Sequence, residues 1–349
     1  MTDVAPSQAT PDARSRAAEL SIVFLGCGNA TRMHSRTLRG MKGVVRFYAS
    51  RALERAKEYA RAYGGRGAFG SYEEAIADER VDVAFVATPP ASHLELALAA
   101  LRAGKDVIIE KPPLLSSRDF DLLTECARAS GRRAFVAENY FYKPLLRRLR
   151  TILEDGEIGE TRFVQLNALK LQRTDDWRGD LALSGGGALY EGGIHWIDFL
   201  ANLGLQVESV RGFVPGSAPD AASASAGRAG ERSVLVVARY REGAIGTLHY
   251  GWDIPSPWRG LRLSRVFGTE GSVTFESNGL FIWLYGHRKR LIVPGLRDIA
   301  GYGAMFRDFL DALRTGRESA FTLARARRDL ELVEEVYRDI GAAMSRASA

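Results

Sequence analysis

The first 150 residues alternate short apolar runs with helical stretches, and this alternation constrains the fold more than any other feature. The apolar runs lie at Ser21–Leu25, Val44–Ala49, Val81–Ala87, Asp106–Ile109 and Arg133–Val136. The helical stretches between them lie at Arg51–Tyr63, Tyr72–Ala77, His93–Ala103 and Phe120–Ala129. Continuous apolar runs are typical of parallel strands buried on both faces. The pattern therefore predicts an α/β, doubly wound parallel sheet over residues 21–150, in which ligands bind beyond the carboxyl ends of the strands.

The rhythm changes after residue 150, where strands follow one another with few helices between them. The expected strands are Arg162–Leu171, Val207–Val214, Ser233–Tyr240, Ala244–Gly251, Leu261–Gly268, Ser272–Glu276 and Leu280–Leu284. The expected helices are Leu189–Leu203, Tyr302–Arg314 and Leu323–Ala343. Residues 151–349 are thus predicted to form an α+β domain with a large, mostly antiparallel open sheet. Residues 1–20 are interpreted as a flexible N-terminal tail, and Pro215–Gly230 as a low-complexity loop.

Composition narrows the functional class. The net charge of +6 is spread along the chain among acidic residues, so we expect no nucleic-acid groove and favour an anionic small ligand. No apolar run of about 18 residues is present, so no membrane span is expected. The two cysteines are too few for a disulfide scaffold, and we expect a cytoplasmic protein. The five histidines are scattered, and no metal site is predicted.

A glycine-rich turn follows the first apolar run and opens a helical stretch. Gly26, Gly28, Asn29, Ala30 and Thr31 occupy this turn, with Thr31 where a G-x-G-x-x-G motif has its third glycine. Glycine lets backbone N–H groups approach a pyrophosphate closely, and a helix N-terminus favours the negative charge. The turn predicts a dinucleotide site.

The end of the second apolar run predicts which dinucleotide binds. Ser50 and Arg51 stand where NAD-specific proteins carry a carboxylate for the ribose 2′-hydroxyl, and Arg55 lies one helical turn later. Serine and arginine can hydrogen-bond a 2′-phosphate, which a carboxylate would repel. We expect NADP(H) to be preferred, with NAD(H) possible as the cofactor.

Two further loops follow predicted strands at the same edge of the sheet. Glu110 and Lys111, which we expect to contact the cofactor, precede two prolines, and the Lys111–Pro112 bond is a candidate cis bond. The ammonium of Lys111 would hydrogen-bond the substrate oxygen whose proton is gained or lost as hydride moves. Thr88, Pro89 and His93 form the other loop, which we expect to face the dinucleotide.

A glycine-rich helix carries the third set of candidates. Glu191 and His195 are four residues apart and share one face, and Asp198 follows three residues later. Two glycines, Gly192 and Gly193, break the helical propensity between them, which is common at functional sites. Histidine can give and take a proton near neutral pH, so His195 is the expected acid/base, with Glu191 and Asp198 orienting its ring.

These motifs together resemble the glucose–fructose oxidoreductase / inositol dehydrogenase (Gfo/Idh/MocA) family. The segments that carry the resemblance are GCGNAT at 26–31, ASR at 49–51, TPPASH at 88–93, AGKDVIIEKP at 103–112, ENYFYKP at 138–144, WRGD at 177–180, GGGALYEGGIHWID at 185–198 and FGTEGSVTF at 267–275. The resemblance implies a nicotinamide cofactor, and homodimers or homotetramers built through the second sheet. It implies that Lys111 is the active-site lysine and His195 the acid/base histidine, and Glu191 stands where many members carry aspartate.

The resemblance also implies that Trp177 and Arg178 border the nicotinamide and that Asn139 and Tyr140 line the cleft. Lys111, Tyr140, Glu191, His195 and Asp198 are then the expected substrate-binding residues, and Lys111, His195 and Glu191 the catalytic ones. The aromatic residues Tyr250, Trp252 and Trp258, with His249, suit either sugar stacking or a subunit interface.

The resulting hypothesis is an NADP(H)-dependent oxidoreductase acting on a secondary alcohol or ketone of a sugar, cyclitol or nucleotide-sugar-like substrate. One alternative is a non-catalytic dinucleotide-binding sensor or regulator on the same fold. The other is a lyase or glycosidase that uses the nicotinamide transiently.

Overall fold

The apolar runs of the first half form a six-stranded parallel sheet, which confirms the predicted fold class. The computed structural model describes residues 19–172, 177–215, 230–255 and 261–347. The strands are β1 (Leu20–Leu25), β2 (Val44–Ala49), β3 (Gly67–Phe69), β4 (Val83–Val86), β5 (Asp106–Ile109) and β6 (Ala134–Val136), in the order β3-β2-β1-β4-β5-β6. The side chains of β1, β4 and β5 are almost completely buried, as their continuous hydrophobicity requires.

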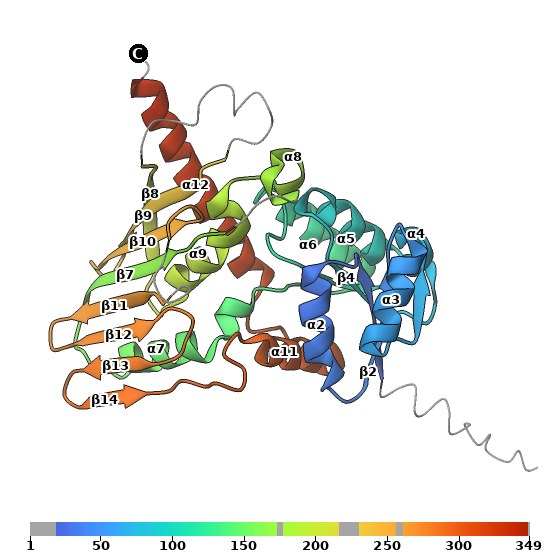
Figure 1. The fold of residues 1–349 in the computed structure, drawn as a ribbon, viewed down its shortest axis with the longest axis horizontal. Coiled ribbons are helices and arrows are strands. Elements are labelled where there is room, and N and C mark those ends of the chain that lie inside the picture. The colour runs from blue at the N-terminus through green and yellow to red at the C-terminus, as the bar shows by residue number, and fades with distance from the viewer. Residues whose placement is uncertain (1–18, 173–176, 216–229, 256–260, 348–349) are drawn as a thin grey trace, which may run out of the picture.

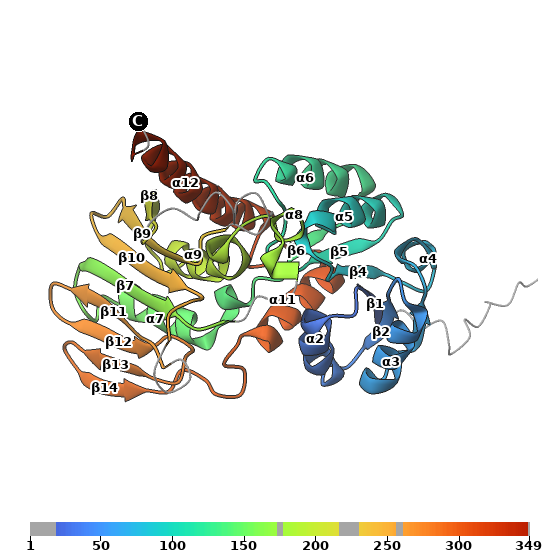
Figure 2. The ribbon, with the colours of Figure 1, turned by 45° about the horizontal axis from the view of Figure 1, so that its top comes forward.

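Helices connect these strands and cover both faces of the sheet (Figures 1 and 2). They are α2 (Asn29–Arg39), α3 (Leu53–Tyr63), α4 (Tyr72–Ala77), α5 (His93–Arg102) and α6 (Asp119–Ser130), with a short turn η1 (Pro90–Ser92) before α5. Because all six strands are parallel, the loops after β1, β2, β4, β5 and β6 meet at one edge of the sheet. The predicted motifs lie in these loops.

The second half forms an eight-stranded sheet in which only β7 and β10 pair in parallel. Its strands are β7 (Thr161–Leu169), β8 (Val207–Phe213), β9 (Ser233–Tyr240), β10 (Ile245–Gly251), β11 (Leu263–Gly268), β12 (Ser272–Glu276), β13 (Ile282–Tyr285) and β14 (Lys289–Ile292). The order is β14-β13-β12-β11-β7-β10-β9-β8. Antiparallel pairs join β9 to β10 and β11 to β12, and the short connections between them contain Arg241–Gly243 and Thr269–Gly271.

Helices and short helical turns lie between this sheet and the first domain, so that one sheet face points inward and the other outward (Figure 2). They are η2 (Asn139–Tyr142), α7 (Pro144–Glu154), η3 (Trp177–Gly179), α8 (Leu181–Ser184), η4 (Leu189–Gly193), α9 (Ile194–Ala201), α11 (Tyr302–Thr315) and α12 (Leu323–Ala347). On β7 the inward side chains Val164, Leu166 and Ala168 are buried, whereas the outward Phe163 is 57% exposed.

Helix α11 departs from the simple division at residue 150. Although it belongs to the last part of the chain, it packs against the first sheet, where Phe306 contacts Phe85 and Phe309 contacts Phe135. The C-terminal segment therefore returns to the dinucleotide-binding half. The sequence pattern also did not predict α7, β3 or β14, which are short or lack a strong apolar period.

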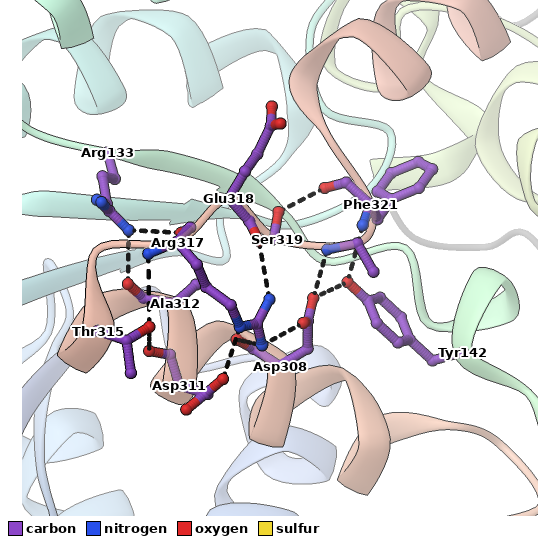
Figure 3. A network of polar contacts seen from close by, with 11 residues as sticks. Arg133, Tyr142, Asp308, Asp311, Ala312, Thr315, Arg317, Glu318, Ser319 and Phe321 are labelled. Carbon is purple, nitrogen blue, oxygen red and sulfur yellow. Dashed lines mark hydrogen bonds and ion pairs between the residues drawn. The ribbon is translucent and has the colours of Figure 1, made fainter.

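A polar network anchors this return (Figure 3). The Arg133 guanidinium, next to β6, donates to the carbonyls of Ala312, Gly316 and Arg317 at the end of α11. The Tyr142 hydroxyl donates to Asp308 (2.6 Å) and accepts from the backbone N–H of Phe321 (3.2 Å). These bonds satisfy the exposed carbonyls of the helix end and connect η2, α11 and the start of α12.

We expect Tyr142→Phe to destabilise the fold by about 1–3 kcal/mol, because the Phe321 N–H loses its acceptor in a buried position. Urea unfolding followed by circular dichroism measures the loss. Tyr285→Phe is the matched control. Tyr285 is 51% exposed on β13, so the loss of its hydroxyl leaves no buried group without a hydrogen-bond partner. Equal stability of both variants would contradict the anchoring role of the network.

Candidate active site

The turn between β1 and α2 has the geometry of a pyrophosphate cradle. Gly26 has a φ of +109°, and a Cβ there would lie 2.8 Å from the Ala87 carbonyl oxygen of the neighbouring strand loop. Gly28 is different, because a Cβ there would meet no atom within 4 Å. Gly28 is the N-cap of α2 and makes no side-chain cap. Within the described residues, the N–H groups of Asn29, Ala30 and Thr31 at the start of α2 donate to no protein acceptor, as a phosphate site requires.

Two side chains that were expected to bind the cofactor instead hold this turn in shape. The Thr31 hydroxyl is fully buried and donates to the Gly26 carbonyl at 2.6 Å, so the side chain at the third glycine position of the motif is accommodated inside the turn. Arg55 Nε donates to the Cys27 carbonyl at 2.7 Å, and the Tyr59 hydroxyl donates to the Gly28 carbonyl. Because these bonds use the Thr31 hydroxyl and Arg55 Nε, a ligand could receive hydrogen bonds only from the Thr31 backbone N–H and from the other guanidinium nitrogens of Arg55.

The end of β2 presents a serine and a free arginine. Ser50 is buried, and its hydroxyl accepts a hydrogen bond from the Ala52 N–H. Arg51 is exposed, and within the described part of the chain its guanidinium makes no hydrogen bond or ion pair. The three residues at the end of β2, Ala49, Ser50 and Arg51, include no carboxylate.

Lys111 reaches from the first half of the molecule to the second. It follows β5, its bond to Pro112 is cis, and its Nζ donates to the Glu191 backbone carbonyl at 3.0 Å. The Glu191 carboxylate lies 3.6 Å from the same Nζ and accepts from Arg178 Nε at 2.9 Å. Burial opposes the charged form of Glu191, but the positive charges of Lys111 and Arg178 outweigh it and lower its pKa to about 2. Glu191 is therefore an anion at neutral pH.

His195 is held by a carboxylate that sequence reasoning did not single out. Its Nδ1 lies 2.6 Å from Glu138 Oε1, at the end of β6. The Tyr140 ring stacks on the imidazole, with 4.4 Å between centroids. Nε2 makes no hydrogen bond to the described residues, and the side chain stays 14% exposed. With Nδ1 fixed by an acceptor, Nε2 is the nitrogen that can exchange a proton with a substrate.

The structure corrects the expected role of Asp198. Its side chain is completely buried and accepts from Asn202 Nδ2 at 2.9 Å, on the side of α9 that faces Asp329 of α12. Burial raises the pKa of both aspartates well above the ordinary value. Glu138 rather than Asp198 orients His195, because the Asp198 side chain points into the buried contact between α9 and α12.

His93, Asn139 and Glu110 are likewise supporting residues rather than surfaces open to a ligand. Both ring nitrogens of the fully buried His93 face backbone carbonyls, of Thr88 on one side and of Pro112 and Pro113 on the other. Asn139 donates its amide to the Ala300 carbonyl. Glu110 accepts from the Lys111 N–H at 2.6 Å and pairs with His34 at 2.7 Å. Thr88 and Pro89 remain partly exposed at the end of β4.

The glycines of the candidate helix allow it to lie directly on the sheet. Leu189–Gly193 forms a wide π-helical turn before the regular helix α9, a departure that is frequent at functional sites. A Cβ on Gly192 would lie 2.3 Å from the Tyr250 hydroxyl, and one on Gly193 would lie 2.8 Å from Leu189. Tyr250 and Trp252 are buried beneath this turn, so they are packing residues, and Trp258 lies outside the described residues.

Sequence reasoning missed Glu138 and Lys170. Glu138 lies just after β6, as Lys111 lies just after β5, and this position after a parallel strand could have indicated a site residue. Lys170 directly follows β7, and only the register of the second sheet brings it toward Glu191. Within the described ranges, no group of three histidine, cysteine, aspartate or glutamate side chains is arranged to hold a metal ion. Within the same ranges, every helix is too short or too polar to cross a bilayer.

Comparison with known families agrees with this geometry. A family described as an oxidoreductase family with an NAD-binding Rossmann fold matches residues 20–138. A second, described as the GFO/IDH/MocA C-terminal domain, matches residues 146–274.

Individual relatives are more distant. The trans-1,2-dihydrobenzene-1,2-diol dehydrogenase of Sus scrofa is 34% identical over 157 residues, which are 44% of this chain and 45% of the relative. The chain spans about half the length of the curated relatives it matches. Among solved structures, levoglucosan dehydrogenase in complex with NADH has a TM-score of 0.82 at 21% identity, with 93% of this chain and 97% of that chain covered. GenD2 from gentamicin A biosynthesis, in complex with NAD, has a TM-score of 0.78 at 24% identity, with 97% of each chain covered.

We expect Gly192→Ala to displace the Tyr250 ring or the π-helical turn, and to cost about 1–3 kcal/mol of unfolding free energy because the added methyl group overpacks the site. Thermal unfolding measures the loss. Gly40→Ala is the control, since a Cβ there lies at an ordinary 3.8 Å from the nearest atom. The double variant with Tyr250→Phe should recover part of the loss. A Gly192→Ala protein as stable as the control would show that the close approach is not needed.

Proposed function

The chain belongs to the Gfo/Idh/MocA oxidoreductase family, and on this premise we propose that it is an NADP(H)-dependent oxidoreductase of a secondary alcohol or ketone. The proposed substrates are sugars, cyclitols or nucleotide-sugar-like molecules. One observation carries the proposal: Lys111 of the first half contacts the helix that holds His195 of the second, at the carboxyl edge of the parallel sheet. The Lys111 ammonium and the His195 imidazole then both act at the same end of this helix, where the substrate would bind.

The residues present fit a nicotinamide dinucleotide. The open space at Gly28 and the uncapped N-terminus of α2 suit its pyrophosphate, and Trp177 and Arg178 lie beside Glu191 where the nicotinamide end would be bordered. When bound, such a cofactor supplies the acceptor or donor of hydride. The chain's own residues must then bind the substrate oxygen and move its proton.

Lys111 and His195 suit these two tasks. The Lys111 ammonium donates a hydrogen bond to the substrate oxygen and stabilises its developing negative charge. His195 Nε2 takes the hydroxyl proton during oxidation and returns it during reduction. Glu138, 2.6 Å from Nδ1, stabilises the imidazolium that forms, and Glu191 holds Lys111 in place by its carbonyl and carboxylate.

The preference for NADP(H) rests on the end of β2. Arg51 has no protein partner among the described residues, and no carboxylate is present to bind a free 2′-hydroxyl or repel a phosphate. The Ser50 hydroxyl lies beside it. These are the donors that a 2′-phosphate needs.

Self-association through the second sheet stays a prediction, as does a cytoplasmic location. The outward face of the sheet carries exposed apolar side chains on β7, β11, β13 and β14: Phe163, Leu263, Trp283, Tyr285 and Leu291. Such a face suits a second copy of the chain. Cys27 and Cys126 are unpaired, which agrees with a reducing compartment.

We expect Lys111→Ala to lower kcat by about a hundredfold or more while leaving the Kd of NADPH nearly unchanged, because the side chain acts on the substrate oxygen. Steady-state absorbance at the nicotinamide band and fluorescence titration measure the two quantities. Lys57→Ala, on the exposed face of α3, is the control.

Full turnover by the Lys111→Ala protein would refute the assignment. Cofactor binding without any redox change across a sugar and nucleotide-sugar panel would instead favour a sensor. Substrate loss without a net change in cofactor absorbance would favour a lyase or glycosidase.

We expect the wild-type protein to bind NADPH about tenfold more tightly than NADH, and Arg51→Ala to remove most of this difference by losing a charge-assisted hydrogen bond to the 2′-phosphate. Paired fluorescence titrations measure both ratios. Arg61→Ala, farther along α3, is the control. A tenfold preference for NADH in the wild type would overturn the cofactor assignment.

A further inference from the structure

Beyond Lys111 and His195, the inner end of the second sheet gathers positive charges that the proposed reaction does not use. Lys170 directly follows β7, in phase with the inward residues Leu166 and Ala168. Arg262 precedes β11, in phase with the inward Ser264 and Val266. Because β7 and β11 are antiparallel neighbours, these two positions lie at the same end of the same face.

Lys143 supplies a third cation from a different element. It is the N-cap of α7, only 3% exposed, and its Nζ lies 4.2 Å from the centre of the Tyr140 ring. Tyr140 in turn stacks on His195. Arg262 lies 5.8 Å from the ring of Trp196, the residue after His195, and within electrostatic range of both lysines. Lys143 and Arg262 therefore lie against the aromatic residues next to His195, and Lys170 lies within electrostatic range of Arg262.

These cations make no direct ion pair, although Glu276 and Glu138 act on Lys143 and Glu191 acts on Lys170 from a greater distance. Across the described residues, none of the three forms an ion pair, and neither lysine Nζ makes a hydrogen bond to a protein group. Arg262 donates to Asn278, but its Nε is buried without a partner. Glu138 and Glu191 already pair with His195 and with Lys111 and Arg178, which leaves Glu276, held by the Asn278 and Gly279 N–H groups, as the one of these carboxylates that can offset the three cations.

Lys143 is buried, and Lys170 and Arg262 are partly buried. Cations withdrawn from water without a direct ion pair are costly, so folded proteins normally pair them or place them where a ligand supplies the charge. Burial lowers the pKa of Lys170 and of Lys143 to about 8 in each case. The pyrophosphate of the cofactor does not neutralise these cations, because its binding turn lies at the end of β1. What remains beside His195 is the substrate.

We propose that Lys170, with Arg262 and Lys143, forms a subsite for an anionic group on the substrate, a carboxylate or a phosphate. The inference rests on the proposed function and refines its substrate class from neutral sugars to acidic or phosphorylated ones. Lys170 is the specificity-determining residue, because it also lies within electrostatic range of Lys111 and Glu191 and so links the subsite to the reacting oxygen.

The test uses protein loaded with its nicotinamide cofactor, whose binding is read first from fluorescence. Failure at that step counts against the proposed function alone. D-glucose, D-glucuronate and D-glucose 6-phosphate are then titrated as matched neutral, carboxylate and phosphate probes. At least one anion should bind about tenfold more tightly than glucose, and the tighter of the two identifies the source of the charge.

Variants assign the effect to Lys170. Lys170→Met should lose about tenfold in affinity for the favoured anion and keep its affinity for glucose, whereas Lys170→Arg should retain the preference. Lys57→Met, on α3, should change neither affinity. Since the pKa of Lys170 is lowered to about 8, the side chain loses its charge as the pH rises through 8, and wild-type affinity for the anion should fall over that range. The Lys170→Arg protein should show a smaller fall, because only Lys143 then loses its charge there.

Equal affinity for all three probes, no binding of either anion at millimolar concentration, or an unchanged preference in Lys170→Met would each overturn the subsite.

Discussion

The contact between Lys111 and Glu191 is the interaction on which the site depends. It joins the loop after β5 to the π-helical turn before α9, two segments 80 residues apart in the chain. The ammonium is held by a carbonyl and a carboxylate at once, and the same carboxylate binds Arg178 from a third segment. This contact holds Lys111 of the first domain against the helical segment that carries His195 of the second. The low pKa of Glu191, about 2, means that this connection persists throughout the neutral range.

A second, buried interaction supports Lys111 from behind. Glu110 accepts the Lys111 N–H and pairs with His34 of α2, and the His34 ring packs against Tyr302 and Phe306 of α11. Helix α11 therefore stabilises the loop that carries Lys111. This explains why α11 crosses back to the first sheet, and why its end is secured by the network around Arg133 and Asp308.

Local patterns predicted where the candidate residues lie better than they predicted their contacts. Strand ends and helical spacing place Lys111, Glu191 and His195 without knowledge of the rest of the fold, and their catalytic roles stay predictions. Asp198 and His93 were assigned to ligand contacts that packing denies them, since each points into a buried interface with its polar atoms already bonded. Glu138 and Lys170 were missed because their importance comes from what lies opposite them, and no residue beside them in the chain indicates that.

The amino-acid sequence by itself determined the parallel sheet, the glycine turn, the lysine after β5 and the Glu-x-x-x-His spacing, because each follows from periodicity or chain geometry over a few residues. Only the tertiary structure decided which carboxylate orients His195, why Gly192 must lack a side chain, and where the unpaired cations of the second sheet meet. Those outcomes depend on contacts between segments that are distant along the chain. Their distances are set by how β6, β7 and α9 pack, which local sequence does not encode.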